Sequence, residues 1–170
     1  HNIDFSDGYI SELNLNNSKW IKAIDKCIDT GVLFVIDYGY ASQEYFLHDR
    51  SDGTLVCIHK HKSNFDPLSN IGNQDISSFV NFSHLKNLSL NTDLTVSGFL
   101  SQSSFLINLN ILDIHQSKNY SADEAQIESN KLKNILLPNT MGELFKVLVM
   151  QKNIDVELKS TKEFNQMHKL

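Results

Sequence analysis

The chain has 170 residues, a mass of 19.4 kDa and a formal net charge of −5. That length favours one domain or two small ones, and 41% hydrophobic with 21% charged residues is typical of a soluble globular protein. The composition excludes a collagen-like chain, an extended disordered chain and a disulfide-dense mini-protein. The sequence pI of about 5.7 argues against nucleic acid as a partner, because a basic surface is needed to replace phosphate counterions.

The cysteines and the N-terminal residues bear on the cellular compartment. Cys27 and Cys57 are the only cysteines and neither belongs to a CxxC pair, which favours two reduced thiols. No apolar run approaches the roughly 18 residues of a membrane span, and the first residues do not resemble a signal peptide. We therefore expect no membrane partner and a cytoplasmic location, or the mitochondrial matrix in a eukaryote. The chain opens at His1 without Met, which we interpret as a processed or truncated product or a tag remnant.

The first predicted elements are a helix and a buried strand. Apolar residues recur at helical spacing within 19–30, after Ser18 as a candidate N-cap, and Gly31 follows where a glycine often ends a helix. The next five residues, 32–36, are uninterrupted and apolar. An apolar run without alternation is typical of a parallel strand covered on both faces. These elements together predict the αβ half of a doubly wound sheet.

The rest of the chain predicts further strands and helices around an irregular middle region. A Ser121–Glu124 capping box begins one helix and Pro138 ends it. From residue 153 onward the chain is charged and is expected to be poorly ordered. The predicted strands are 54–59, 76–82, 94–100 and 145–150, the predicted helices are 83–90, 104–115 and 121–136, and a long loop covers 60–75.

Asp37 is the first candidate for a functional-site residue. It follows the predicted strand 32–36, and open α/β sheets bind ligands at the carboxyl ends of their strands. So short a motif favours about equally an aspartate that only caps a loop.

The sequence lacks the motifs of several common catalytic and ligand-binding sites. His59 and His61 share a strand face, but there is no HExxH and no cysteine pair, so we predict no metal site. There is no GxSxG elbow for a serine nucleophile and no GxxxxGK[ST] loop for a nucleotide. There is also no GxGxxG turn, which would let the backbone approach a dinucleotide or S-adenosylmethionine.

One segment resembles a known family. Residues 31–39, GVLFVIDYG, resemble the "G-x-L-L-x-I-D-Y-G" strand of the MidA-like S-adenosylmethionine-dependent methyltransferases, which are related to the mitochondrial complex I assembly methyltransferase. Glu12 is placed to match a family glutamate, and the resemblance extends to Met150. Further motifs follow in the family's order: GTLVCIHKH at 53–61, DPLSNIGNQDIS at 66–77, VNFS at 80–83, QSSFL at 102–106 and LPNTMGELFKVL at 137–148.

The sequence also departs from the family pattern. Phe79 stands where the family has a histidine, Ser77 replaces a threonine and Asn81 replaces an aspartate. The loss of an imidazole at position 79 removes any acid–base or substrate-binding role that a histidine would have there.

The resemblance implies a fold class and a domain division. The fold is α/β, the C-terminal portion of a class I (Rossmann-like) methyltransferase sheet with an inserted, irregular middle region. Residues 1–152 are expected to be the C-terminal half of such a domain, and 153–170 a charged tail. The strand 32–36 would be the fifth of the sheet, and 94–100 and 145–150 its final antiparallel pair. The glycine-rich cofactor motif of the family would lie outside this chain.

The resemblance further implies methylation of arginine in a partner protein, with S-adenosylmethionine as cofactor. A cationic guanidinium would be oriented by carboxylates, so Asp37 and Asp75 are the candidate catalytic residues. Tyr38 is a candidate to stack on the guanidinium, Gln74 to bond it, and Glu143 to bind substrate. Glu143 is at least as well explained as a carboxylate that caps backbone N–H groups. We assign no cofactor-binding residue within this chain.

A non-catalytic interpretation stays open. Without the glycine turn, the chain is alternatively a protein-interaction module or a pseudo-enzyme fragment. A half sheet with one strand edge exposed would pair with other chains. This predicts a homo-oligomer, or association with a missing N-terminal half.

Overall fold

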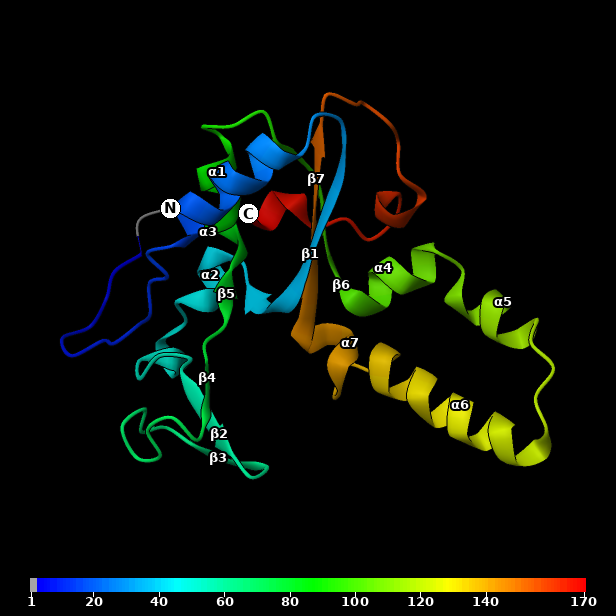
Figure 1. The fold of residues 1–170 in the computed structure, drawn as a ribbon, viewed down its shortest axis with the longest axis horizontal. Coiled ribbons are helices and arrows are strands. Elements are labelled where there is room, and N and C mark those ends of the chain that lie inside the picture. The colour runs from blue at the N-terminus through cyan, green and yellow to red at the C-terminus, as the bar shows by residue number, and fades with distance from the viewer. Residues whose placement is uncertain (1–2) are drawn as a thin grey trace.

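The computed structural model describes residues 3–170, which form a mixed α/β fold with two sheets (Figure 1). The main sheet has four strands in the order β5–β1–β7–β6, and a small sheet has three in the order β3–β2–β4. In Figure 1, α1 and α3 lie to one side of the main sheet, while α4, α5 and α6 extend away on the other. The strands of the main sheet are β1 (Gly31–Tyr40), β5 (Val80–Asn81), β6 (Thr95–Ser101) and β7 (Phe145–Lys152).

Strand β1 is longer than the predicted strand and pairs differently. It is antiparallel to β7 over its first eight residues and parallel to β5 over its last two. The prediction of a parallel strand covered on both faces is therefore wrong. Phe34, Ile36 and Tyr38 point to one face and are 43%, 49% and 39% exposed, because no described element fully covers that face. The predicted antiparallel pair is confirmed as β6 and β7.

The hydrophobic core lies between the other face of the main sheet and helices α1 (Asn17–Cys27) and α3 (Phe82–Ser89). Both helices were predicted, at 19–30 and 83–90. Ile21 of α1 is fully buried, and Leu33 and Val35 of β1 pack against the core. The buried core residues are Ile21, Ala41, Phe82, Leu85, Leu94, Phe99, Leu148 and Met150.

The irregular middle region contains the small sheet, formed by β2 (Val56–His59), β3 (Lys62–Asn64) and β4 (Asp75–Ser77). The predicted loop 60–75 is therefore partly strand. Lys60 and His61 have φ of 50° and 62°, the conformation that a two-residue hairpin turn requires. The predicted strand 76–82 is divided between β4 of the small sheet and β5 of the main sheet. A short helix, α2 (Ser42–Tyr45), follows β1 directly.

The predicted helix 104–115 is two helices, α4 (Gln102–Asn108) and α5 (Ile111–Gln116). Asn110 between them has a left-handed φ of 59°, which interrupts the helical hydrogen bonds. The capping box is confirmed at the start of α6 (Ala122–Leu136). The short helix α7 (Met141–Leu144) then leads into β7.

The C-terminal segment, expected to be poorly ordered, instead packs along β6. The Gln166 N–H donates to the Phe99 carbonyl at 2.7 Å, and the Phe99 N–H donates to Asn165 Oδ1 at 3.1 Å. Met167 and Leu170 pack against the core. Polar amide groups in the segment therefore satisfy the outer edge of β6. Two short 3₁₀ helices, Lys159–Thr161 and Met167–Lys169, form part of it.

Within residues 3–170, no helix has the length and apolar character needed to span a membrane. Both cysteines are free thiols, with Cys57 buried and Cys27 exposed.

Candidate functional site

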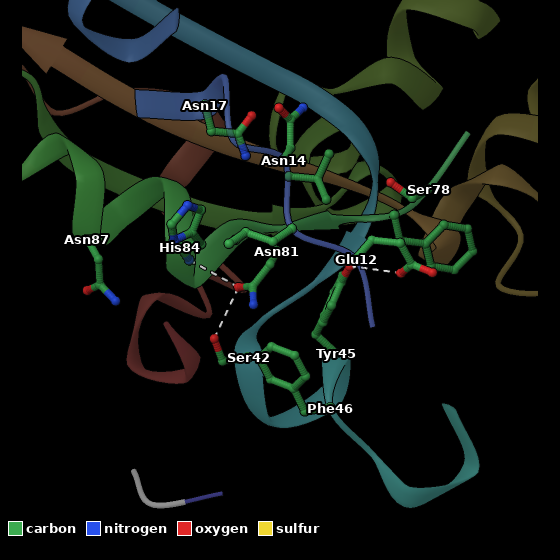
Figure 2. Close-up of a pocket in the computed structure, with 13 residues that line it drawn as sticks. Glu12, Asn14, Asn17, Ser42, Tyr45, Phe46, Ser78, Asn81, His84 and Asn87 are labelled. Atoms are coloured by element: carbon green, nitrogen blue, oxygen red, sulfur yellow. Dashed lines mark hydrogen bonds between the residues drawn. The ribbon is translucent and has the colours of Figure 1, made fainter. Parts of the chain in front are cut away.

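A polar cavity of about 270 Å³ lies where the parallel strands β1 and β5 end. Ligands of open α/β sheets bind outside the carboxyl ends of strands, so this position is a candidate site. Helix α2, the start of α3 and the segment before α1 form its walls (Figure 2). It is lined by Glu12, Leu13, Asn14, Asn17, Ser42, Tyr45, Phe46, Ser78, Phe79, Val80, Asn81, His84 and Asn87.

Amide and hydroxyl groups dominate this cavity. Asn81 caps α3: its Oδ1 accepts from the His84 backbone N–H at 3.0 Å and from Ser42 Oγ at 3.1 Å. The Ser42 N–H donates in turn to Ser83 Oγ at 2.9 Å. These bonds tie the end of β1 to the start of α3, as the dashed lines in Figure 2 show in part. The side chains that remain can exchange neutral hydrogen bonds with a polar ligand.

Glu12 is the one carboxylate among the lining residues, and both of its oxygens already accept hydrogen bonds. It accepts from the N–H of Thr54 at 3.0 Å, from Thr54 Oγ1 at 3.0 Å and from the N–H of Leu55 at 3.0 Å. The Tyr45 hydroxyl reaches it at 3.5 Å. Burial, the largest cause, raises the pKa of Tyr45. Glu12 therefore holds the GTL motif in place.

Gly53, the first residue of that motif, has a structural reason to be glycine. Its φ is +84°, and a Cβ there would lie 2.2 Å from Glu12 Oε1. Thr54 extends the network, since its Oγ1 also accepts from the N–H of Phe79 at 3.0 Å. The network therefore joins the GTL motif to the segment that lines the cavity.

Asp37 lies on β1 and lines a second cavity of about 320 Å³ together with Trp20 and Val35, whereas Tyr38, the next residue, lies on the opposite face of the strand. Asp37 is exposed, and its Oδ1 accepts from the N–H of Tyr38 at 2.8 Å. The Tyr38 ring lies 3.9 Å from that of Phe145 and 6.1 Å from that of Phe79, measured between centroids.

The other predicted site residues are dispersed. Glu143 on α7 accepts from Lys146 Nζ at 3.1 Å, and Lys146 is paired with Asp37 in the β1–β7 register. Glu143 is thus near the same end of β1. Gln74 is used within its own loop: it accepts from Asn64 Nδ2 at 3.1 Å and donates to the Asp66 carbonyl at 3.0 Å.

Asp75 is exposed on β4 of the small sheet, which projects away from the main sheet in Figure 1. The structure therefore brings Asp37, Tyr38 and Glu143 to one end of the main sheet. It leaves Gln74 and Asp75 on the small one.

An aromatic cluster connects the two sheets. Phe79, at a position where the resemblance implies a histidine, lies 5.6 Å from the Tyr40 ring. The guanidinium of Arg50 lies 4.0 Å from the centroid of the same ring. Phe79 therefore contributes packing where an imidazole would contribute hydrogen bonds.

The amide residues of the cavity, Asn14, Asn17 and Asn81, were missed by our sequence analysis, as was His84. For Asn81 the signal was available, because asparagine is a preferred N-cap, but the predicted strand 76–82 included it, whereas α3 begins directly after it. The positions of Asn14 and Asn17 carry no such signal, since they line the cavity only once the chain has folded.

The polar cavity does not by itself fit S-adenosylmethionine. The polar cavity, at about 270 Å³, lies below the roughly 300–1,000 Å³ of ligand pockets, and its one carboxylate is already bonded to Thr54 and Leu55. Within residues 3–170 there is also no cluster of side chains suited to a metal ion.

Comparison with known proteins found a family model and crystal structures that are similar to this chain. Residues 1–100 match the family model described as "Putative S-adenosyl-L-methionine-dependent methyltransferase". The fold is similar to the native crystal structure of a COG1565 superfamily protein from Burkholderia thailandensis, with a TM-score of 0.92 and 30% identity over 97% of this chain and 44% of that chain.

A second crystal structure, of a COG1565 superfamily member from the same organism bound to S-adenosyl-homocysteine, also has a TM-score of 0.92 and 30% identity, over 97% of this chain and 43% of that chain. The chain therefore spans less than half the length of these relatives. Among curated proteins, no sequence matches significantly.

Proposed function

Because the chain belongs to a family of S-adenosylmethionine-dependent methyltransferases, we propose that it takes part in methyl transfer from S-adenosylmethionine. The observation that carries this proposal is the TM-score of 0.92, over 97% of the chain, with a relative bound to S-adenosyl-homocysteine. That ligand is the product that S-adenosylmethionine leaves after it gives up its methyl group. The family match over residues 1–100 supports the same conclusion.

This chain supplies the side of the enzyme that receives the methyl acceptor. Its polar cavity is smaller than typical ligand pockets, and the relatives have more than half of their length outside the matched region. The glycine-rich turn that approaches S-adenosylmethionine would therefore belong to the part of the MidA-like fold that this chain does not contain.

The acceptor is an arginine in a partner protein. At the end of β1, Asp37 offers an exposed carboxylate on one face of the strand and Tyr38 a half-exposed aromatic ring on the other. The neighbouring Tyr40 already holds the guanidinium of Arg50 at 4.0 Å, so aromatic residues at this end are suited to guanidinium stacking. Glu143 would add negative charge, and Asp75 and Gln74 would contact the partner from the small sheet. The enzyme would act in the cytoplasm, or in the mitochondrial matrix of a eukaryote.

The test uses tritiated S-adenosylmethionine, the natural full-length polypeptide that carries this sequence, and arginine-containing peptides. We expect Asp37→Asn to lower kcat/KM about 10- to 100-fold, because one charge-assisted hydrogen bond contributes about 1.5–3 kcal/mol. Exposed Asp155→Asn in the C-terminal segment is the matched control and should retain full activity. Label incorporated only into lysine, or equal activity of both variants, would contradict the assignment. No transfer to any peptide would favour the non-catalytic interaction module.

A further inference from the structure

A basic cavity of about 310 Å³ lies beside the hairpin that joins β2 to β3. The small sheet that holds this cavity projects away from the main sheet (Figure 1). The basic cavity shares no lining residue with the polar cavity at the end of β1, and the proposed methyl transfer does not use its residues. It is lined by His59, Lys60, Lys62, Ser63, Asn64 and Asn70, so none of the described residues that line it carries a carboxylate.

Positive charge is concentrated around the basic cavity. The chain has a net charge of −5, yet two lysines and two histidines stand together in residues 59–62. Within residues 3–170, neither Lys60 nor Lys62 forms an ion pair. His59 and Lys62 lie opposite one another in the β2–β3 register, where a protonated imidazole would repel the ammonium group. An anion bound between them would remove this repulsion.

The two acidic residues within 56–77 do not neutralise the basic cavity. Asp75 is paired with Ile58 in the β2–β4 register. Successive residues of a strand point to opposite faces, so Asp75 lies on the face of the small sheet opposite to His59. The other acidic residue, Asp66, accepts at Oδ1 from the Leu68 N–H at 2.9 Å. The donors of the cavity are therefore left for a ligand.

Hydrogen bonds hold the walls of the basic cavity in place. His59 Nδ1 donates to the Asn73 carbonyl at 2.5 Å. This bond orients the ring, and protonation then places the second donor on Nε2. Asn64 Nδ2 donates to Gln74 Oε1 at 3.1 Å, and Asn64 Oδ1 accepts from the Asp66 N–H at 3.0 Å. The loop after β3 is thus fixed against the hairpin without a ligand.

The turn of the hairpin has residues that are unusual for its backbone conformation. Lys60 and His61 have φ of 50° and 62°, and a two-residue turn of this kind prefers Asn–Gly. The left-handed conformation is unfavourable for a residue with a long side chain. This cost is explained if the Lys60 side chain is needed at the cavity that it lines.

We propose that the basic cavity binds a phosphate dianion, either as free phosphate or as a phosphoryl group on a partner protein. A phosphoryl group has a charge of about −1.5 to −2 at pH 7 and three acceptor oxygens. These match the donors of Lys60, Lys62 and His59, and lysine binds phosphate as a point charge. A carboxylate brings one charge and two oxygens, so it would leave part of this donor set unused. The site goes beyond the proposed function, because phosphate has no part in methyl transfer.

The test titrates inorganic phosphate into the natural full-length polypeptide that carries this sequence. Ionic strength is held constant, because salt screens exposed charges. Calorimetry measures Kd, and NMR shifts of backbone amides locate the site. We expect saturable binding, with shifts confined to residues 59–64 and 70. Lys62→Gln should weaken binding about tenfold or more, because a charge-assisted hydrogen bond is lost, and Lys62→Arg should retain most of the affinity.

Two control variants leave the lining of the basic cavity unchanged. Lys19→Gln removes the same charge from an exposed position on α1, and His61→Asn changes the same hairpin at a residue that does not line the cavity. Both should bind phosphate with unchanged affinity. Absence of saturation, equal weakening by Lys19→Gln and Lys62→Gln, or acetate binding as tight as that of phosphate would overturn the proposal. Thermal melts of both Lys62 variants separate a folding defect from a loss of binding.

A phosphoserine peptide and its unphosphorylated counterpart identify the source of the phosphate. Tighter binding of the phosphopeptide than of inorganic phosphate would assign the site to a phosphorylated protein. Equal binding of the two would assign it to free phosphate and small phosphate esters. If both peptides bound equally well and with the same shifts in 59–64, the site would not recognise phosphate, and the proposal would be wrong.

Discussion

Glu12 joins the segment before α1 to the loop before β2 through one carboxylate group. It is bonded to Thr54 and Leu55, and Gly53 leaves the space that the carboxylate occupies. The GTL motif is therefore explained by the conformation of its backbone, which must point successive N–H groups at one carboxylate. This is a structural role next to the candidate site.

Substitutions at two glycines with nearly the same φ distinguish strain of the left-handed backbone from strain caused by a steric clash. Gly53 and Gly72 have φ of +84° and +78°, but only at Gly53 would a Cβ meet another atom, Glu12 Oε1 at 2.2 Å. Gly72→Ala should cost roughly 1 kcal/mol from the left-handed backbone alone. Gly53→Ala should cost about 1–3 kcal/mol more, because the bonds of Glu12 must be displaced. Urea unfolding measures both, and equal losses would show that Glu12 adapts freely.

Lys152, Asp25 and Asp93 form an ion cluster between α1 and the end of β7. Lys152 Nζ lies 2.8 Å from Asp25 Oδ1 and 3.5 Å from Asp93 Oδ2. The hydrogen bond from Lys152 is the largest cause that lowers the pKa of Asp25, and the same bond raises the pKa of Lys152. Each group is therefore more stable in its charged form in the folded protein than in the unfolded chain.

The cluster predicts a pH dependence of stability. Because the folded pKa of Asp25 is lowered, its contribution is present above its unfolded pKa, near 3.9, and is lost as the pH falls through the folded value. Asp25→Asn should therefore reduce the free energy of unfolding at pH 6 and reduce the further loss below about pH 4. Urea titrations at several pH values measure this. Asp155→Asn is the control, and an unchanged acid limb in Asp25→Asn would refute the assignment.

At the scale of elements, helix α6 shows how a local signal sets a boundary. The Ser121 N–H donates to Glu124 Oε2 at 2.9 Å, and the Glu124 N–H donates back to Ser121 Oγ at 3.4 Å. The first of these bonds is the largest cause that lowers the pKa of Glu124. Both partners lie within four residues, so this boundary was predictable from the sequence.

Replacement of the N-cap residue of α6 tests how much the cap contributes to the stability of the protein. Ser121→Ala should destabilise the protein by about 1 kcal/mol, because N–H groups of the first turn lose their acceptor. Ser129→Ala, in the interior of the same helix, should be neutral or slightly stabilising, because alanine has the higher helix propensity. Chemical unfolding followed by circular dichroism distinguishes them. A loss of equal size at both positions would mean that packing of α6, and not its cap, determines the effect.

The boundaries and pairing of other elements depended on contacts between residues that are far apart in the sequence. The apolar run 32–36 predicted a strand correctly, but its spacing did not reveal that β7 lies antiparallel beside it. The predicted helix 104–115 divides at Asn110, whose left-handed φ of 59° is compatible with asparagine but not required by it. Periodicity identifies the type of an element, whereas pairing direction and breaks arise from its neighbours.

At the scale of the whole molecule, the C-terminal segment is part of the fold. Asn108 Nδ2 donates to the carbonyls of Ser160 and Glu163 at 2.9 and 2.8 Å, and Lys86 Nζ donates to the Leu170 carbonyl at 2.9 Å. The charged composition that predicted poor order is compatible with order here, because buried amides bond the backbone of the segment.

Asn165 is the residue through which this segment covers β6. Asn165→Ala should destabilise the fold by about 1–3 kcal/mol, because the N–H of Phe99 loses its acceptor in a partly buried site. Asn139→Ala, at an exposed loop position, should change stability little. Chemical unfolding measures both effects. Hydrogen exchange at Phe99 should accelerate in Asn165→Ala, and unchanged exchange there would show that the segment does not protect this edge.

The sequence alone determined the element types through local spacing, and its resemblance to a family rests on short motifs: the capping box, the GVLFVIDYG segment and the GTL motif all depend on residues close together in the chain. The arrangement of the candidate site needed the tertiary structure. Glu12 and Thr54 are 42 residues apart, and Asp37 and Glu143 approach only because β1 pairs with β7. Contacts between distant residues decide which edge of the sheet is closed and which stays open, because they depend on the register and pairing of strands and not on the spacing within any one segment.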